Sequence, residues 1–113
     1  MAPVRYGRRN KFGAIRTTID GQTFDSKHEA GRWMKLRLLQ AAGRIQGLTR
    51  QTRYPLVVNG VEVTSYRPDF EYVVTATGEA IVEDAKSGPT RTRDYLIRKK
   101  LMLACHGIAI AEV

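Results

Sequence analysis

Two acidic residues and one lysine form the pattern in this sequence that is best suited to chemistry. Asp69 lies in the segment RPDF at residues 67–70, and Asp84 and Lys86 lie in the segment EDAK at residues 83–86. Two carboxylates within reach of one point make a hard oxygen site of the kind that suits Mg²⁺. A metal ion there would activate water for phosphodiester hydrolysis, and the lysine would stabilise the charged transition state.

Both segments are predicted to lie on strands, and the strand pattern decides which side chains meet. Residues 66–75 and 79–86 should pair around a turn at Thr77-Gly78, which brings Asp69 close to Asp84. Side chains alternate along a strand, so Asp84 shares a face with Lys86 while Glu83 points the other way. Glu83 adjoins Asp84 and could in principle be the ligand instead. The same spacing has a purely structural explanation as the alternative, in which Lys86 forms a surface salt bridge and Asp69 caps a turn.

The first helix has a clear start in the sequence. Ser26 and Glu29 fit a capping box, and apolar residues then recur every three or four positions until Gly43. We therefore expect a helix over residues 27–42, preceded by a short hairpin formed by residues 15–19 and 23–24. Glu29 has two possible roles, as a residue of the metal site or as the helix cap alone.

The remaining elements alternate between extended and helical patterns. Residues 45–48 are read as a short connection, and 55–58 and 61–64 as a hairpin around Asn59-Gly60. A second helix is expected over 92–105 and a last strand over 108–113. The order of helix, antiparallel strands, helix and strand predicts an α/β fold, with a mixed sheet flanked by helices. One domain should span residues 17–113.

Basic residues are unevenly distributed along the chain. Lys and Arg outnumber Asp and Glu by 19 to 11, for a formal net charge of +8, and residues 1–16 and 30–53 contain no acid. The first stretch is also aperiodic, which is typical of a flexible arm. Its basic residues, which we expect to contact DNA phosphates, are Arg5, Arg8, Arg9, Lys11 and Arg16. A basic surface that serves only solubility is the alternative.

The second helix follows the predicted catalytic strand and offers further DNA contacts. Tyr95, Arg98 and Lys99 could face the DNA backbone, with Ile97 and Leu101 turned inward. A merely solvated helix face is an equally good account of any one of them.

No segment suggests a membrane partner. The sequence has no apolar stretch near the roughly 18 residues of a membrane span, and no signal-peptide pattern at its start. We expect a cytoplasmic protein.

Taken together, the motifs resemble a known superfamily. FDSKHEA at 24–30, then Gln51 and Tyr54, then RPDF at 67–70 and VEDAK at 82–86, are similar to short phage and prophage proteins of the PD-(D/E)XK nuclease superfamily. The resemblance covers roughly residues 20–113. The superfamily that these motifs resemble includes Holliday-junction resolvases. It implies a restriction-endonuclease-like αβββαβ core and a phage or prophage protein in a bacterial host cell.

The resemblance also implies roles for individual residues. Asp69 matches the aspartate of the PD element, Asp84 the D/E position and Lys86 the motif lysine, while Glu29 matches an acidic residue that many members carry on the first helix. It implies a DNA endonuclease that uses Mg²⁺ or Mn²⁺ bound by Asp69, Asp84 and Glu29. We expect a homodimer acting on duplex or branched DNA. The alternatives are a nucleic-acid-binding module without catalysis and a subunit of a larger phage DNA-processing complex.

Overall fold

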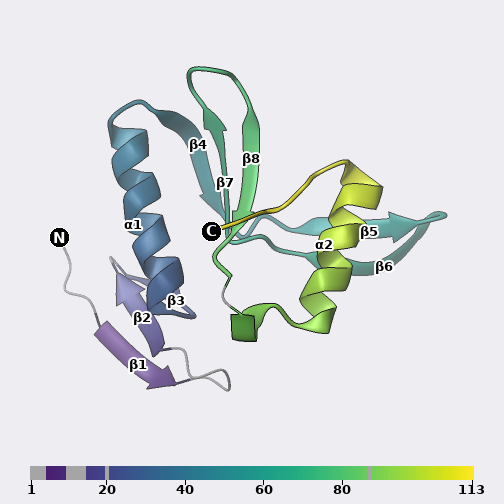
Figure 1. The fold of residues 1–113 in the computed structure, drawn as a ribbon, viewed down its shortest axis with the longest axis horizontal. Coiled ribbons are helices and arrows are strands. Elements are labelled where there is room, and N and C mark those ends of the chain that lie inside the picture. Colours follow the sequence, from purple (N-terminus) through teal and green to yellow (C-terminus); the bar gives the residue numbers. More distant parts are fainter. Residues whose placement is uncertain (1–4, 10–14, 20, 87) are drawn as a thin grey trace.

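The computed structural model describes residues 5–9, 15–19, 21–86 and 88–113, and it shows an α/β protein with two helices and a mixed sheet (Figure 1). The helices are α1 (Lys27–Ala41) and α2 (Arg93–His106), with a 3₁₀ turn at Gly88–Thr90. The strands are β1 (Arg5–Arg9), β2 (Ile15–Ile19), β3 (Gln22–Phe24), β4 (Ile45–Arg50), β5 (Tyr54–Val58), β6 (Val61–Tyr66), β7 (Phe70–Val74), β8 (Ala80–Asp84) and β9 (Ala111–Glu112). Neither described helix has the length and apolarity needed to cross a membrane.

Four strands form the central sheet, in the order β4-β7-β8-β9. The pairs β4·β7 and β7·β8 are antiparallel, and β9 runs parallel to β8, so the sheet is mixed as the element order predicted. Two smaller sheets flank it: β1-β2-β3 lies beside α1, and the β5-β6 hairpin lies beside α2 (Figure 1).

Two apolar cores lie on opposite faces of the central sheet. Phe70 of β7 packs in one cluster with Leu36 of α1, and Val82 of β8 packs in the other with Met102 of α2. Phe70 pairs with Glu83, the residue after Val82, and adjacent residues of a strand point to opposite faces. The α1 side of β8 therefore carries Glu83, and the α2 side carries Val82.

The predicted first helix is confirmed, because its start and end signals work locally. The Ser26 hydroxyl accepts a hydrogen bond from the Glu29 amide at 3.1 Å, as an N-cap does. Gly43, with a φ of 77°, follows the helix in the left-handed conformation that only glycine adopts freely. Trp33 and Leu36 form its buried side.

All three predicted hairpins are also confirmed, the first of them as β2 paired antiparallel with β3. Asn59 and Gly60 have φ angles of 51° and 80°, as a type I′ turn requires, and join β5 to β6. β7 and β8 pair with Phe70 opposite Glu83 and are joined through Gly78, whose φ is 74°.

Three predicted elements differ from the structure. Residues 45–50 form a strand of the central sheet rather than a connection; Gly47 interrupts their pairing with β7, which hid the strand pattern. The strand predicted over 66–75 is divided, because Pro68 lies between the end of β6 and Phe70, where β7 begins. The last strand is shorter than predicted and covers only Ala111–Glu112.

The N-terminal segment is partly ordered into sheet. Arg5–Arg9 forms β1, which pairs antiparallel with β2, where the sequence predicted a flexible arm over residues 1–16. A basic stretch without apolar alternation gives no strand signal of its own, and here the pairing partner is the free edge of β2. Residues 1–4 and 10–14, which belong to the predicted arm, lie outside the described part of the chain.

The second helix presents a different side to the core than predicted. Tyr95 is buried at 6% exposure, whereas Ile97, which was expected to face inward, is 50% exposed. Apolar residues occur on several sides of this helix, so their spacing does not select one face. Tyr95 faces inward because its hydroxyl has a polar partner there, the carboxylate of Glu112.

Candidate active site

Two reciprocal hydrogen bonds join the segment of Asp69 to the segment of Asp84, where β7 begins and β8 ends. The Asp69 amide donates to Asp84 Oδ1 at 2.7 Å, and the Ala85 amide donates to Asp69 Oδ2 at 2.9 Å. The hairpin register that pairs Phe70 with Glu83 places the residues on either side of that pair together. The strand pairing predicted from sequence thus brings the two carboxylates into one cluster.

One oxygen of this cluster is left without a partner. Asp84 is 1% exposed, and its Oδ2 is buried with no hydrogen-bond partner in the described structure. Leaving a buried carboxylate oxygen unsatisfied costs roughly 1–3 kcal/mol or more. This oxygen is therefore the atom of the cluster that most needs a cation or a proton.

Burial dominates the electrostatics of both aspartates. It raises the pKa of Asp84, and the positive charge of Lys86 opposes that rise. Burial likewise raises the pKa of Asp69, while the hydrogen bond from the Ala85 amide and the charge of Lys86 lower it. Lys86 is thus the positive charge that lowers the pKa of both aspartates most, although the effect of burial is larger.

Glu29 belongs to the same electrostatic cluster. It is 5% exposed, and burial raises its pKa to about 7, with the negative charge of Asp69 as the next cause. Its carboxylate also accepts a hydrogen bond from the Asp25 amide at 3.4 Å, next to the N-cap Ser26. Glu29 therefore combines a bond at the helix start with a place beside Asp69, and both roles predicted for it remain open.

Arg50 is a member of the cluster that the sequence did not identify as a site residue. Its Nη2 lies 3.4 Å from Glu29 Oε1, and its guanidinium donates to Gln22 Oε1 at 2.8 Å. Its Cζ lies 4.0 Å from the centre of the Phe24 ring. Nothing in the sequence marks one arginine of a basic tract as the partner of a distant glutamate.

Glu83 faces away from this cluster. It accepts hydrogen bonds from Arg32 Nε at 2.6 Å, from Arg32 Nη2 at 3.0 Å and from the Tyr72 hydroxyl at 2.7 Å. Its carboxylate is therefore occupied on the α1 face of the sheet. Asp84 lies on the other face with its unsatisfied oxygen.

Lys86 lies against an aromatic ring. Its Nζ is 4.5 Å from the centre of the Tyr95 ring, and its amide donates to the Val113 carbonyl at 3.1 Å. The Val113 amide in turn donates to the Asp84 carbonyl at 2.9 Å. The segment that carries Asp84 and Lys86 is therefore fixed by the chain just after β9.

Two of the three DNA-binding candidates on α2 are bonded within the protein. The Tyr95 hydroxyl donates to Glu112 Oε2 at 2.9 Å, and Lys99 Nζ donates to the same oxygen at 2.7 Å. Arg98 is half-buried, with its Nε buried and unpartnered among the described residues. Of the three, Tyr95 has the least surface left for a nucleic acid.

The candidates at the N-terminus are described only in part. Arg16 is exposed on β2. Arg5, Arg8 and Arg9 lie on β1, but their side chains are outside the described structure, as is Lys11 altogether.

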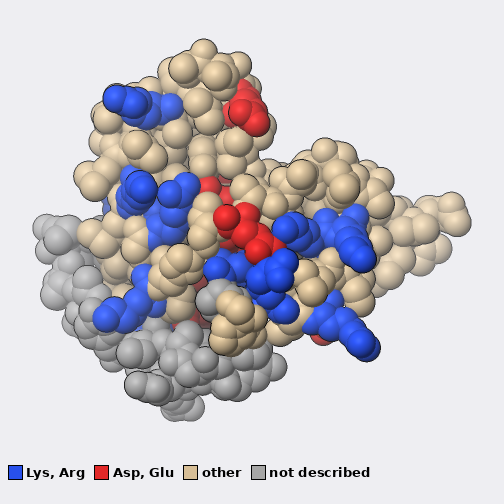
Figure 2. Space-filling model, in the orientation of Figure 1, with Lys and Arg blue, Asp and Glu red and all other residues tan. Residues whose placement is uncertain are grey.

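Exposed acidic and basic side chains form a pattern on one face of the molecule. Figure 2 shows acidic side chains near the centre of this face, with Lys and Arg side chains on both sides of them, over α1 and over α2. A polyanion that crosses this face would meet basic groups on either side of these exposed acidic side chains.

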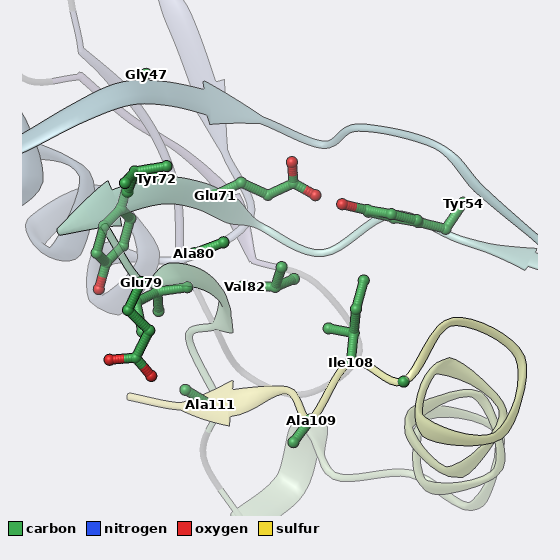
Figure 3. A pocket seen from close by; sticks show the side chains of 13 residues that line it. Gly47, Tyr54, Glu71, Tyr72, Glu79, Ala80, Val82, Ile108, Ala109 and Ala111 are labelled. Atoms are coloured by element: carbon green, nitrogen blue, oxygen red, sulfur yellow. The ribbon is translucent and has the colours of Figure 1, made fainter. Parts of the chain in front are cut away.

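A separate hollow of about 520 Å³ lies against the central sheet. Its lining includes Tyr54, Glu71, Val82 and Ile108, and none of the four predicted site residues (Figure 3). Glu71 and Tyr54 point toward one another across it, and burial together with their hydrogen bond raises the pKa of Tyr54 to about 12. The hollow is distinct from the acidic cluster.

A family model described as "Protein of unknown function (DUF1064)" matches residues 9–106. The chain belongs to the DUF1064 family. The matched range contains Glu29, Asp69, Asp84 and Lys86, and β9 of this DUF1064 chain follows it. No curated protein and no solved structure matches the chain.

The donor set of this DUF1064 chain determines which metal ions it could hold. Among the described residues, no three His, Cys, Asp or Glu side chains are grouped to hold a metal ion. Mg²⁺ is usually bound by one or two carboxylates and retains several waters. Asp69 and Asp84, with the unsatisfied Oδ2, fit that smaller requirement, whereas a zinc site would need more protein ligands.

Proposed function

We propose that this DUF1064 chain is a metal-dependent DNA endonuclease of the PD-(D/E)XK type. The observation that carries the proposal is the pair of reciprocal bonds between the segments of Asp69 and Asp84. These bonds hold two carboxylates together, leave Asp84 Oδ2 buried without a partner and bring Lys86 close.

The order of elements supports a restriction-endonuclease-like core. Without the β5-β6 hairpin, the chain from α1 onward reads α1, β4, β7, β8, α2, β9, which is αβββαβ. The three antiparallel strands and the last parallel strand lie in one sheet, in the order β4-β7-β8-β9. The β5-β6 hairpin is then an insertion between the first and second strands of that core.

In this proposal Asp69 and Asp84 would hold Mg²⁺ or Mn²⁺, which would supply an activated water and neutralise charge on the phosphate. Lys86 places an ammonium beside the carboxylates and would donate to a phosphate oxygen as negative charge grows there. Glu29 adds a third negative charge from α1 beside Asp69, although the three carboxylates are not grouped closely enough in the described structure to hold one ion together. Arg50 holds the Glu29 carboxylate in place.

The charge pattern supports DNA as the substrate. The net charge of +8 and the Lys and Arg side chains over α1 and over α2 on the face shown in Figure 2 would attract a DNA duplex to this face. Arg5, Arg8, Arg9, Lys11 and Arg16 would add contacts to the DNA backbone.

The direct test is cleavage of supercoiled plasmid, linear duplex, single strand and four-way junction, each with Mg²⁺, with Mn²⁺ and with EDTA. We expect metal-dependent nicking or linearisation by the purified protein. Absence of cleavage of all four substrates with either metal would contradict the proposal.

One observation favours a second candidate, a DNA-binding module without catalysis. Asp69 and Asp84 already tie β7 to β8 through backbone amides, so a structural role alone would explain their burial. DNA binding that is unaffected by metal, with intact substrate after long incubation, would identify this alternative. If the protein is a subunit of a larger phage DNA-processing complex, it would also bind DNA without cleaving it when tested alone. It would cleave DNA only when its partner is added.

A further inference from the structure

We propose that Tyr95 is a positioning residue for Lys86, and that Glu112 holds the Tyr95 ring in place for this purpose. The catalytic consequence rests on the proposed nuclease function, whereas the arrangement itself does not. Neither the acidic cluster nor the lysine motif includes Tyr95 or Glu112. They come from α2 and β9.

The Tyr95 ring is the contact that fixes the position of the Lys86 ammonium. Nζ lies 4.5 Å from the ring centre, within the range of a cation–π interaction. Among the described residues, Lys86 forms no ion pair within 4.0 Å. A lysine side chain has four rotatable bonds, so a defined ammonium position requires a partner of this kind.

The ring itself is held on several sides. Tyr95 is 6% exposed, its ring lies edge-on to Tyr66 with centroids 6.2 Å apart, and its amide is capped by the Thr92 hydroxyl. Its hydroxyl donates to Glu112 Oε2 at 2.9 Å. The ring is therefore fixed in both position and tilt.

Glu112 is a suitable anchor because three donors surround it. Besides Tyr95, it accepts from Lys99 at 2.7 Å and from Arg91 at 2.8 Å. These hydrogen bonds lower its pKa to about 2, with Lys99 as the larger cause, so it stays ionised at neutral pH. Its charge also neutralises both cations, which otherwise would compete with Lys86 for a phosphate.

The same C-terminal strand controls the backbone of the lysine. Glu112 pairs with Asp84 in the parallel β8·β9 ladder, and Val113 bonds both Asp84 and Lys86. Val113 thus fixes the backbone position of Lys86, and Glu112, through the Tyr95 ring, fixes the position of the Lys86 ammonium. Because both residues also contact Asp84, the C-terminal end of the chain places the lysine relative to this aspartate.

The test compares Tyr95→Phe, which keeps the ring, with Tyr95→Leu, which removes it. The first readout needs no substrate or metal: the ε-methylene protons of Lys86 should be shifted upfield in NMR spectra by the ring current. The Lys86→Ala spectrum identifies their signal. We expect the full shift in the wild type, a smaller shift in Tyr95→Phe, whose ring has lost its bond to Glu112, and no shift in Tyr95→Leu.

The second readout is cleavage, with melting temperatures measured for every variant. Tyr95→Leu should lower kcat about tenfold at unchanged KM, the effect of removing one cation–π interaction, and the kcat of Tyr95→Phe should lie between those of Tyr95→Leu and the wild type. Tyr54→Phe and Tyr54→Leu are the matched controls, because Tyr54 is also bonded to a glutamate but lies at the separate hollow. Both controls should leave the Lys86 signal unchanged.

Each contrary result has a distinct meaning. An unshifted Lys86 signal in the wild type overturns the ring contact, even if Tyr95→Leu unfolds. A shift that disappears in Tyr95→Leu, with kcat equal to the wild type, overturns the positioning role while leaving the nuclease proposal intact. A folded wild-type protein that cleaves no DNA contradicts the nuclease proposal itself, and with it any catalytic use of Tyr95.

Discussion

Arg50 and Glu29 form an ion pair inside the protein, with Nη2 3.4 Å from Oε1 and both side chains largely buried. The guanidinium is held from two other directions, by the Gln22 side chain at 2.8 Å and by the Phe24 ring at 4.0 Å. Arg50 lowers the pKa of Glu29, but burial and Asp69 raise it more strongly. The ion pair therefore orients the Glu29 carboxylate, but the pKa of Glu29 stays above its ordinary value.

Arg50→Lys should destabilise the fold by about 1–2 kcal/mol, because an ammonium keeps the charge but not the planar stacking or the fork of donors. Urea denaturation at pH 7 measures the change. Arg53→Lys is the matched control, since its pair with Glu62 is nearly half exposed and should contribute less than about 1 kcal/mol. Equal destabilisation at the two positions would show that Arg50 is only a surface cation.

Glu29 should make stability depend on pH. Because its folded pKa is raised from 4.5 to about 7, its contribution is fully present below pH 4.5 and is lost as the pH rises through 7. The loss amounts to about 3 kcal/mol. Between pH 5 and pH 8, the free energy of unfolding of the wild type in EDTA should therefore fall relative to that of Glu29→Gln. Parallel pH profiles for the two proteins would contradict the raised pKa.

Asp84→Asn and Lys86→Ala should each reduce cleavage at least a hundredfold, since one removes a charge at the metal site and the other an interaction with the transition state. DNA binding, measured by fluorescence anisotropy, should largely survive. Glu83→Gln is the control on the same strand. It weakens buried bonds to Arg32 and Tyr72, so the melting temperature should fall while kcat per folded molecule is retained.

Local signals in the sequence were sufficient for the elements that carry the acidic cluster. The Ser26 cap and Gly43 gave the bounds of α1, and the pairing of the two strands around Gly78 brought Asp69 to Asp84. Period-two alternation also separated Glu83 from Asp84. Each of these signals acts over a few residues or one hairpin.

The contacts that the sequence did not reveal join elements distant in the chain. Arg50 reaches Glu29 from another element, and Glu112 reaches Tyr95 from the last strand. Neither partner is marked by spacing, because any of several charged residues could have filled the role. Tyr95 was misplaced for a related reason: its partner Glu112, not the apolar pattern of α2, decides that it faces inward.

Basic residues near the N-terminus should contact DNA without reading its sequence. Replacing Arg5, Arg8, Arg9, Lys11 and Arg16 by Gln leaves the chain length unchanged and should weaken binding to all duplex sequences alike. The slope of log affinity against log salt should become shallower by roughly 0.9 for each DNA phosphate that the protein no longer neutralises. An unchanged slope would show that these residues do not touch the DNA.

The last prediction is that the protein acts as a homodimer and prefers a four-way junction to a duplex. Both helices in the described part of the chain pack in the apolar cores, so backbone geometry is the available cue, and two symmetric cuts need two identical sites. The β5-β6 hairpin offers a surface for a second copy, since Val61 and Val63 are 64% and 60% exposed. Light scattering should give twice the monomer mass, and Val61→Ser with Val63→Ser should give the monomer. A strict monomer that binds duplex as tightly as the junction would contradict this prediction and leave metal-dependent cleavage unaffected.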